Sequence, residues 1–297
     1  MKHRLLLLFL AGALASCSSV ENIQSTELEL EPEATLLSGY PEHASELVED
    51  SLLPFESEPS AQTITDALNQ VVDDAVASFG GEAGIAVASG DLVWSAGDTT
   101  AHPAWSTIKV PISIAALRQN PELYPQVEAA ISYSDNAAAD VLWQSTNPHL
   151  VDEVLAEGKN FISVNTEKVY PEFSAYGQTP WSVEDRAVFA SNLPCISGAE
   201  SVLDLMGNIV ESQSYGLGRL AGARFKGGWG PDLNGNYQVS QLGRIPVESG
   251  DVSIAITVSP AAGTYEASQE MADMVANGLL PEIDQFSVSD CRERSTL

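Results

Sequence analysis

Three short segments of this 297-residue chain carry side chains whose types and spacing could do chemistry together. In the first, residues 104–111, Ser106 and Lys109 are three positions apart. This spacing places both side chains on one face of a helix. Partial burial lowers the pKa of a lysine, and the neutral amine can then take the serine proton and make the serine a nucleophile. A single Ser-x-x-Lys pair is weak evidence, because about half of one is expected by chance in a chain of this composition.

In the second segment, residues 130–139, the triplet Ser134-Asp135-Asn136 follows an apolar run and precedes three alanines. A polar triplet in this setting is typical of a cap or turn that opens a helix. In a reactive site the same residues have other uses. Ser134 would relay a proton to a leaving nitrogen, and Asn136 would contact an amide of the substrate.

The third segment, residues 225–230, has Lys226, Gly227, Gly228 and Trp229 at the end of a predicted strand. Adjacent glycines are typical of a bulge or turn, and they also let a substrate lie against the strand. Trp229, like Trp105 beside the first serine, is interpreted as a core aromatic, with the lining of a cleft as the alternative.

The elements that must position these residues follow from the apolar pattern. Ile64, Leu68, Val71, Val72 and Val76 recur at helical spacing and predict a first helix that ends before Gly80. The remaining predictions are strands at 84–88 and 92–96, a largely helical stretch at 106–210, strands at 223–228, 237–243 and 252–259, and a helix at 265–279. The expected architecture is one sheet plus an all-helical lobe, without an internal repeat.

Ser-x-x-Lys, Ser-Asp-Asn and Lys-x-Gly occur here in the order used by one superfamily, and the chain resembles the serine β-lactamases and penicillin-binding proteins. The resemblance spans about residues 62–280 and includes the phrase Ala-Ile-x-x-Ser-Asp-Asn-x-Ala-Ala and the segment 177–182. In detail the sequence is similar to class A-like serine hydrolases among actinobacterial lipoproteins. The resemblance implies an α+β fold of the β-lactamase/transpeptidase type, with an antiparallel sheet, terminal helices on the sheet and an all-helical lobe.

The resemblance also implies roles for the reactive side chains. Ser106 would attack a carbonyl and become acylated, with Lys109 as its base or proton acceptor. Ser134 and Lys226 would deliver the proton to the departing nitrogen. Asn136 would hold the side-chain amide of the substrate.

Substrate binding would also involve the main chain of the third segment. Gly228 and Trp229 would border the substrate, and the backbone N–H groups of Ser106 and Trp229 would form an oxyanion hole. No cofactor is implied.

Two departures from the family pattern bear on activity. Gly227 stands where the family has a side-chain hydroxyl that helps bind the substrate carboxylate. The absence of that hydroxyl would weaken carboxylate binding by roughly 1.5–3 kcal/mol. The stretch 166–174 holds Glu167 and Glu172 but lacks an asparagine four residues after either. The composition of an acidic protein favours exposed surface acids at both positions. The alternative is that Glu172 or Glu167 serves as the base for deacylation, and of these two we favour Glu172, which lies beside Pro171. Without such a base the acyl-enzyme would be long-lived.

The start of the chain indicates export. Residues 1–17 combine a positive start, a short apolar run and the ending Leu-Ala-Ser-Cys, which predicts a signal peptide and resembles a lipobox with Cys17 as the lipidated residue. The alternative is an ordinary cleaved signal that contains a cysteine. Residues 18–61 form an expected acidic, disordered tether, because 11 acids and no Lys or Arg occur between 18 and 60. We expect the domain at 62–285, a tail at 286–297, and an anchor on the outer face of the membrane.

Charge and cysteine usage limit the partners. Only 13 Lys and Arg stand against 41 Asp and Glu, and a formal net charge of −28 opposes nucleic-acid binding. In an exported protein Cys195 and Cys291 are expected to form a disulfide, with two free thiols as the alternative. No Cys-His spacing suggests zinc or another metal. The expected partners are a small-molecule or peptidoglycan-type substrate and, through the lipid on Cys17, the membrane, and we expect a monomer.

Two further patterns carry no expected function. His102 and His149 lie outside a Gly-x-Ser-x-Gly context, which argues against a Ser-His-Asp triad. Residues 232–236 begin like a calcium loop, but Asn234-Gly235 between two strands predicts a hairpin turn.

The sequence therefore leaves two hypotheses. The first is an exported, membrane-anchored serine hydrolase that transfers the acyl group of a β-lactam or peptidoglycan-type amide through an acyl-serine. The second is a catalytically weak or inactive surface lipoprotein that uses the same fold as a binding module.

Overall fold

The computed structural model describes residues 61–286 and 288. The predicted signal peptide, Cys17, all of the predicted tether except residue 61, and Cys291 lie outside these residues. Within the described part of the chain, no helix combines the length and the apolar character that crossing a membrane requires.

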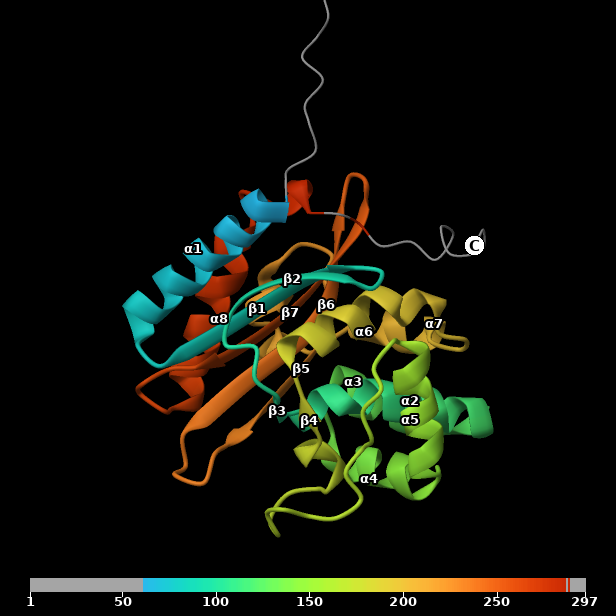
Figure 1. Ribbon diagram of the computed structural model, residues 1–297. Coiled ribbons are helices and arrows are strands. Elements are labelled where there is room, and N and C mark those ends of the chain that lie inside the picture. The colour runs from blue at the N-terminus through green and yellow to red at the C-terminus, as the bar shows by residue number, and fades with distance from the viewer. Residues whose placement is uncertain (1–60, 287, 289–297) are drawn as a thin grey trace, which may run out of the picture. The chain divides into compact units, whose positions relative to one another are not determined.

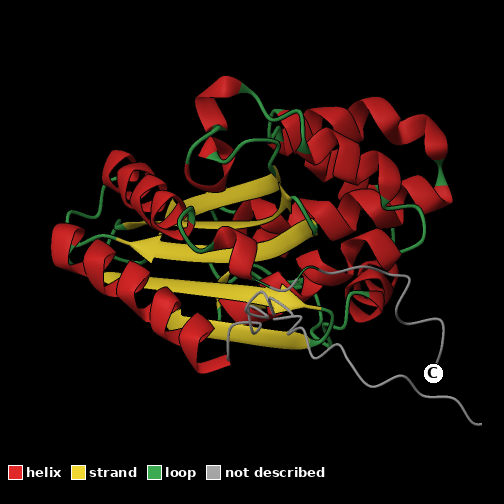
Figure 2. Cartoon of the chain, turned by 90° about the horizontal axis from the view of Figure 1, so that it is seen from above, coloured by secondary structure: helices red, strands yellow, loops and turns green. Residues whose placement is uncertain are grey.

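The described residues form helices on both sides of a central sheet (Figures 1 and 2). The α-helices are α1 (Ala61–Phe79), α2 (Lys109–Gln119), α3 (Tyr124–Ser132), α4 (Asn136–Gln144), α5 (Pro148–Glu157), α6 (Val183–Asn192), α7 (Glu200–Met206) and α8 (Tyr265–Leu279). The strands are β1 (Glu82–Ser89), β2 (Leu92–Gly97), β3 (His102–Pro103), β4 (Pro180–Trp181), β5 (Arg224–Pro231), β6 (Tyr237–Val247) and β7 (Gly250–Ser259).

Five strands form an antiparallel sheet in the order β2-β1-β7-β6-β5. The predicted strands are all present and most extend further than predicted, because backbone pairing continues beyond the apolar runs, as far as Glu82 with Ser259, Pro231 with Tyr237 and Val247 with Gly250. Helices α1 and α8, the first and last, pack together on one face, and α6 crosses the other face (Figure 1). β5 lies at the edge of the sheet and carries the Lys226 segment. The predicted antiparallel sheet with terminal helices and a helical lobe is confirmed.

Alternation along the strands divides the core into two. On β1, Ile85 and Val87 pack toward α1 and α8, whereas Ala86 and Ala88 pack toward α6 and the helical lobe. The first helix contributes the predicted buried face, including Leu68. A sheet that is buried on both faces cannot shift register without exposing one of the two apolar sets, so its edge strand is held firmly.

The turn after β5 confirms the predicted hairpin. Asp232 Oδ1 accepts hydrogen bonds from the backbone N–H groups of Asn234 and Asn236 at 2.7 and 2.8 Å, and Gly235 has a φ of 86°. The Asp232 carboxylate is therefore used to close the turn.

The stretch 106–210 is less helical than predicted. It holds helices α2 to α7, but no helix covers residues 159–175. Shortly after this loop, β4 pairs with β3. This loop is stabilised by side-chain contacts instead of a helical ladder, as described below. At the other end of the chain Phe286 is buried in the core, and the carbonyl of Val288 accepts a hydrogen bond from Ser89 Oγ at 2.9 Å.

Candidate active site

Ser106 and Lys109 lie where a one-turn 3-10 helix, Trp105–Ile108, continues into α2. Ser106 is half-buried, whereas the Lys109 side chain is 1% exposed. The apolar residues around them, including Ile108 and Val110, are fully buried and fix the helix in the core. Trp105 has a φ of 48°, a conformation that bulky residues rarely adopt. Strain of this kind, directly before the predicted nucleophile, is common at functional sites.

The Ser134-Asp135-Asn136 triplet opens α4, as the capping interpretation predicts. Asp135 Oδ1 accepts a hydrogen bond from Ala138 N at 2.7 Å, which satisfies one of the free N–H groups of the first turn. Ser134 precedes the cap in the left-handed region, with a φ of 56°. The cap and the proposed chemistry are therefore compatible, because Asp135 fixes the turn while its neighbours face Lys109.

The two lysines and Ser134 form one hydrogen-bonded cluster. Lys109 Nζ donates to Ser134 O at 2.6 Å, to Asn136 Oδ1 at 2.7 Å and to Ser134 Oγ at 3.4 Å. Lys226 Nζ donates to the same Ser134 Oγ at 2.9 Å and to Gly227 O at 2.8 Å. Residues from three distant segments thus meet at a single hydroxyl.

Burial changes the acid–base behaviour of both lysines. It lowers the pKa of Lys109 from 10.5 to about 8, and Asp135 and Asp140 oppose this change. At pH 7 about a tenth of the Lys109 amines are then neutral. Lys226 is fully buried, and burial together with the nearby Lys109 charge holds its pKa well below the ordinary value. A neutral amine at neutral pH is what a base for Ser106 requires.

Strand β5 runs directly against the first turn of the serine helix. A Cβ added at Gly228 would lie 2.6 Å from Ser106 N and 2.9 Å from Ala104 O, so only glycine fits there. The close approach brings together the two main-chain segments that would supply the Ser106 and Trp229 N–H groups. Because the first N–H groups of a helix have no acceptor within the helix, this is a suitable place for a developing oxyanion.

A cavity of about 650 Å³ opens in front of this cluster. Ser106, Lys109, Asn136 and Trp229 are among the residues that line it, and so is Glu172, the favoured deacylation base. Glu167 is not among the lining residues.

Gln178 holds the loop that carries Glu172. This amide is 4% exposed and bonds the loop backbone four times. Its Oε1 accepts from Tyr170 N at 2.6 Å, and its Nε2 donates to the carbonyl oxygens of Tyr170, Phe173 and Ser174 at 3.0–3.3 Å. The loop that carries Glu172 is therefore held in a fixed position by Gln178 and forms one wall of the cavity.

Sequence patterns did not reveal several residues of this wall. Asp140 lies one helical turn after Asn136, and Tyr176 donates to its Oδ1 at 2.7 Å. Burial, followed by that hydrogen bond, raises the pKa of the Tyr176 hydroxyl, which stays a donor. The helical spacing of Asp140 from Asn136 could have indicated it, whereas nothing local marks Gln178.

Both tryptophans of the reactive segments reach the cavity and are also packed. The Trp105 ring is 7% exposed and meets Phe173 edge-on, with ring centres 5.1 Å apart. The Trp229 ring stacks on Tyr265 at 5.3 Å. Each of these tryptophans therefore packs against other aromatic side chains and also lines the cavity, as the two interpretations of the sequence proposed.

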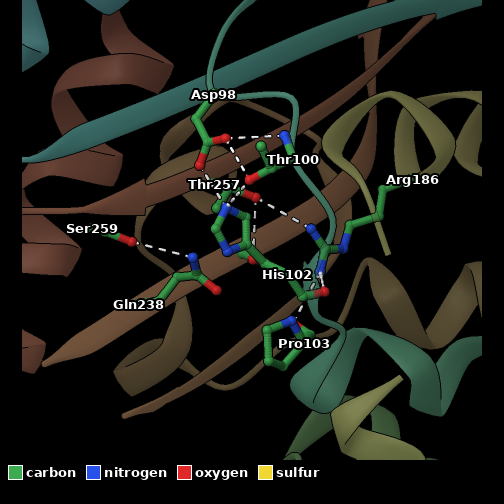
Figure 3. Close-up of polar contacts among 9 residues, drawn as sticks. Asp98, Thr100, His102, Pro103, Arg186, Gln238, Thr257 and Ser259 are labelled. Atoms are coloured by element: carbon green, nitrogen blue, oxygen red, sulfur yellow. Dashed lines mark hydrogen bonds and ion pairs between the residues drawn. The ribbon is translucent and has the colours of Figure 1, made fainter. Parts of the chain in front are cut away.

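The two histidines form no pair with a serine among the described residues. The His102 ring bonds Asp98 and Thr100, at the sheet end drawn in Figure 3. In the same view the buried Arg186 donates to Thr257 and to the carbonyl of Pro103. His149 pairs with Glu153 on the exposed surface of α5.

Cys195 is disulfide-bonded. Its predicted partner Cys291 lies outside the described residues, so the Cys195–Cys291 pairing stays a prediction.

The chemistry of this site is suited to serine acyl transfer, because a serine lies near two buried lysines that share one hydroxyl at the edge strand of the sheet. Comparison with solved structures agrees with this at the level of the fold. The TLA-3 extended-spectrum β-lactamase is similar with a TM-score of 0.60 and 14% identity, over 74% of this chain and 99% of that one. A class A β-lactamase from Bacteroides cellulosilyticus DSM 14838 has a TM-score of 0.62 and 12% identity, over 75% and 99%. The β-lactamase from Sphaerobacter thermophilus DSM 20745 has a TM-score of 0.58 and 17% identity, over 75% and 98%.

No protein-family model and no curated protein sequence matches the chain. The chain has the serine β-lactamase fold, in the class A arrangement, as its three motifs predicted. Identities of 12–17% establish this fold, and the activity has to be argued from the site.

Proposed function

We propose that this protein is an exported, membrane-anchored serine hydrolase that transfers an acyl group through an acyl-serine intermediate. The observation that carries the proposal is the Ser134 hydroxyl held between Lys109 and Lys226, with Lys109 lining the same cavity as Ser106. Ordinary folding gives no reason to bury two lysines against one hydroxyl, because a buried ammonium is destabilising unless its surroundings compensate. The anchor rests on Cys17 and the signal pattern alone.

The reaction follows from the positions of these groups. Ser106 Oγ forms a bond to the carbonyl carbon of an amide or ester, and its proton passes to the neutral Lys109 amine. The negative charge on the carbonyl oxygen is met by the Ser106 and Trp229 N–H groups. The bond to the leaving group breaks as Ser134 gives its hydroxyl proton to that group and takes in exchange the proton held by Lys109, while Lys226 holds the Ser134 oxygen in place. Water, activated by Glu172, then cleaves the acyl-serine and releases the acid.

A binding module is the second candidate. It is favoured by the direction of Lys109 Nζ, which bonds Ser134 and Asn136, while Ser106 Oγ makes no hydrogen bond among the described residues. Gly227, which offers no hydroxyl, also favours it.

Covalent labelling separates the two candidates. The protein is incubated with a labelled penicillin and, in parallel, with a neutral fluorophosphonate, which reports a reactive serine without amide recognition. Intact mass is followed with time for the wild type and for Ser106→Ala. An adduct that disappears in the variant supports acyl transfer, and its lifetime measures deacylation. If neither reagent labels Ser106, the proposed hydrolase is wrong and the binding module stands.

A further inference from the structure

We propose that this site takes neutral acyl substrates with an aromatic or apolar group, in preference to substrates that carry a carboxylate next to the reacting centre. The inference rests on the proposed acyl transfer at Ser106 and narrows its substrate. It follows from what the cations, the edge strand and the cavity walls present to a ligand.

The two lysines of the cluster are not open to a carboxylate, because Lys109 uses all three of its donors and Lys226 is fully buried and does not line the cavity. Lys226 is fully buried, and its Nζ is bonded to Ser134 Oγ and Gly227 O. Lys109 is 1% exposed and donates three hydrogen bonds, to Ser134 O, Ser134 Oγ and Asn136 Oδ1. An ammonium has three donors, so Lys109 is saturated.

The arginines of the described chain are engaged elsewhere, and none of them lines the cavity. Their contacts are Arg118 with Glu157, Arg186 with Thr257 and Pro103, Arg219 with Asp273, and both Arg224 and Arg244 with Asp251. Bidentate recognition of a carboxylate by a guanidinium is therefore not offered at the reacting centre.

The face of β5 at Gly227 is closed as well. A Cβ at Gly227 would lie 3.8 Å from both Gln241 Nε2 and Tyr215 Oη, and these groups have partners already. Gln241 Oε1 accepts from Leu217 N at 2.7 Å, its Nε2 donates to Tyr215 O at 2.8 Å, and Tyr215 Oη bonds Tyr265 at 3.2 Å. Gly227 itself contributes no side-chain donor, and these bonds hold the buried Gln241 and Tyr215 side chains among their neighbours.

The charged side chains that line the cavity offer an anion no net attraction, because Asp140 and Glu172 balance Lys109 and Lys168. Asp140 and Glu172 lie in its wall, and Lys168 is the exposed lysine beside them. Lys168 Nζ already donates to Pro171 O at 3.0 Å, and an exposed lysine contributes little attraction through water. The chain as a whole has a formal net charge of −28, which adds repulsion at long range.

Aromatic side chains supply most of the remaining contact surface. Trp143, Phe173, Trp229 and Tyr237 line the cavity and are half-buried. Their positions are fixed by ring contacts, such as Trp143 on Tyr176 at 5.3 Å. Preformed aromatic walls bind flat or apolar groups by burial and ring contacts, and a neutral phenyl or alkyl group suits them.

Matched substrate pairs test the inference on the purified full chain. Benzylpenicillin is compared with its methyl ester, and 4-nitrophenyl phenylacetate with 4-nitrophenyl hydrogen phenylmalonate, so that each pair differs mainly in one carboxylate. Acylation rates are divided by the rate of each compound with hydroxide, which removes intrinsic reactivity. We expect the neutral member to acylate Ser106 faster by about tenfold or more in both pairs.

Each outcome decides the question. An equal or faster normalised rate for the carboxylate member overturns the proposal, and Lys168→Gln then tells whether the loop lysine receives it. Fluorophosphonate labelling of Ser106 without reaction of any of the four compounds also overturns it, while acyl transfer itself survives. Absence of fluorophosphonate labelling instead refutes the proposed function. The role of the aromatic walls is tested with Trp143→Ala. This variant should lower the acylation rate with 4-nitrophenyl phenylacetate, which carries a phenyl group, more than with 4-nitrophenyl acetate, which has no phenyl group in its acyl part.

Discussion

Lys226 Nζ donates a 2.9 Å hydrogen bond to Ser134 Oγ, and Lys109 approaches the same oxygen from the other side at 3.4 Å. Each lysine comes from a different element, β5 and α2, and the hydroxyl sits between them on the turn before α4. Because two ammonium groups around one oxygen repel each other, protonation of the pair is coupled. In the proposed reaction, the two lysines would supply the proton that Ser134 passes to the leaving group.

Ser134→Ala should impair amide cleavage far more than ester cleavage. An amide nitrogen must be protonated to leave, whereas 4-nitrophenolate leaves without a proton. We expect β-lactam acylation to fall by about 100-fold or more and the nitrophenyl ester rate to fall much less. Ser134→Gly is the control, since glycine accepts the φ of 56° without strain and still lacks the hydroxyl. Full β-lactam activity in the glycine variant would exclude the relay.

The rate of Ser106 acylation should rise with pH and level off, with an apparent pKa near 8. Burial lowers the Lys109 pKa to about 8, and only the neutral amine can accept the serine proton. The measurement is the fluorophosphonate labelling rate from pH 6 to 10. A rate that is flat, or that falls over this range, would mean that Lys109 is not the base.

Lys109→Met should stabilise the fold while it abolishes acylation. Burial lowers the pKa of Lys109 in the folded protein from 10.5 to about 8, whereas in the unfolded chain Lys109 keeps its proton until about pH 10.5. Protonation of Lys109 therefore favours the unfolded chain, and the wild type is less stable at pH 7 than at high pH. The wild type therefore gains stability as the pH rises from 8 toward 10.5, and the variant does not. Thermal melts at pH 7 and pH 9.5 should show a gain for the variant that shrinks at the higher pH. An unchanged gain would contradict the buried-lysine explanation.

Gly228→Ala should abolish Ser106 labelling, and the neighbouring Gly227→Ala should be tolerated. The new Cβ at 228 would lie 2.6 Å from Ser106 N, against backbone that cannot move without shifting α2. At 227 the nearest atoms are 3.8 Å away, which is ordinary contact. The two substitutions add the same methyl group one residue apart on one strand. Equal labelling by both variants would show that the approach of β5 to Ser106 is not needed.

Gln178→Ala should slow deacylation and leave acylation nearly unchanged. The buried amide makes four hydrogen bonds to the loop that carries Glu172, and their loss frees Tyr170, Phe173 and Ser174. We expect the acyl-enzyme lifetime to lengthen about tenfold, together with faster proteolysis in the loop. Gln144→Ala is a matched control, because this amide also lines the cavity and is exposed. A shorter or equal lifetime in Gln178→Ala would show that Glu172 does not depend on the loop's position.

The strands, the terminal helices and the three motifs could all be predicted from the sequence. Periodicity is a local property, so the buried face of α1 and the alternation of β1 could be predicted from residues close in the chain. The order of Ser106-x-x-Lys109, Ser134-Asp135-Asn136 and Lys226 was enough to indicate the fold. The Asn234-Gly235 turn needed only its own residues.

Which side chains meet, and at what pH they release their protons, depends on contacts between segments that are far apart in the chain. The lowered pKa of Lys109 comes from burial by distant segments, and the convergence of two lysines on Ser134 Oγ joins residues up to 117 positions apart. Gln178 is an ordinary amide in the sequence, and its role arises because one short side chain reaches four backbone groups of a folded loop. The proposed substrate preference also rests on tertiary contacts, because it depends on the partners that the described lysines and arginines find in the fold.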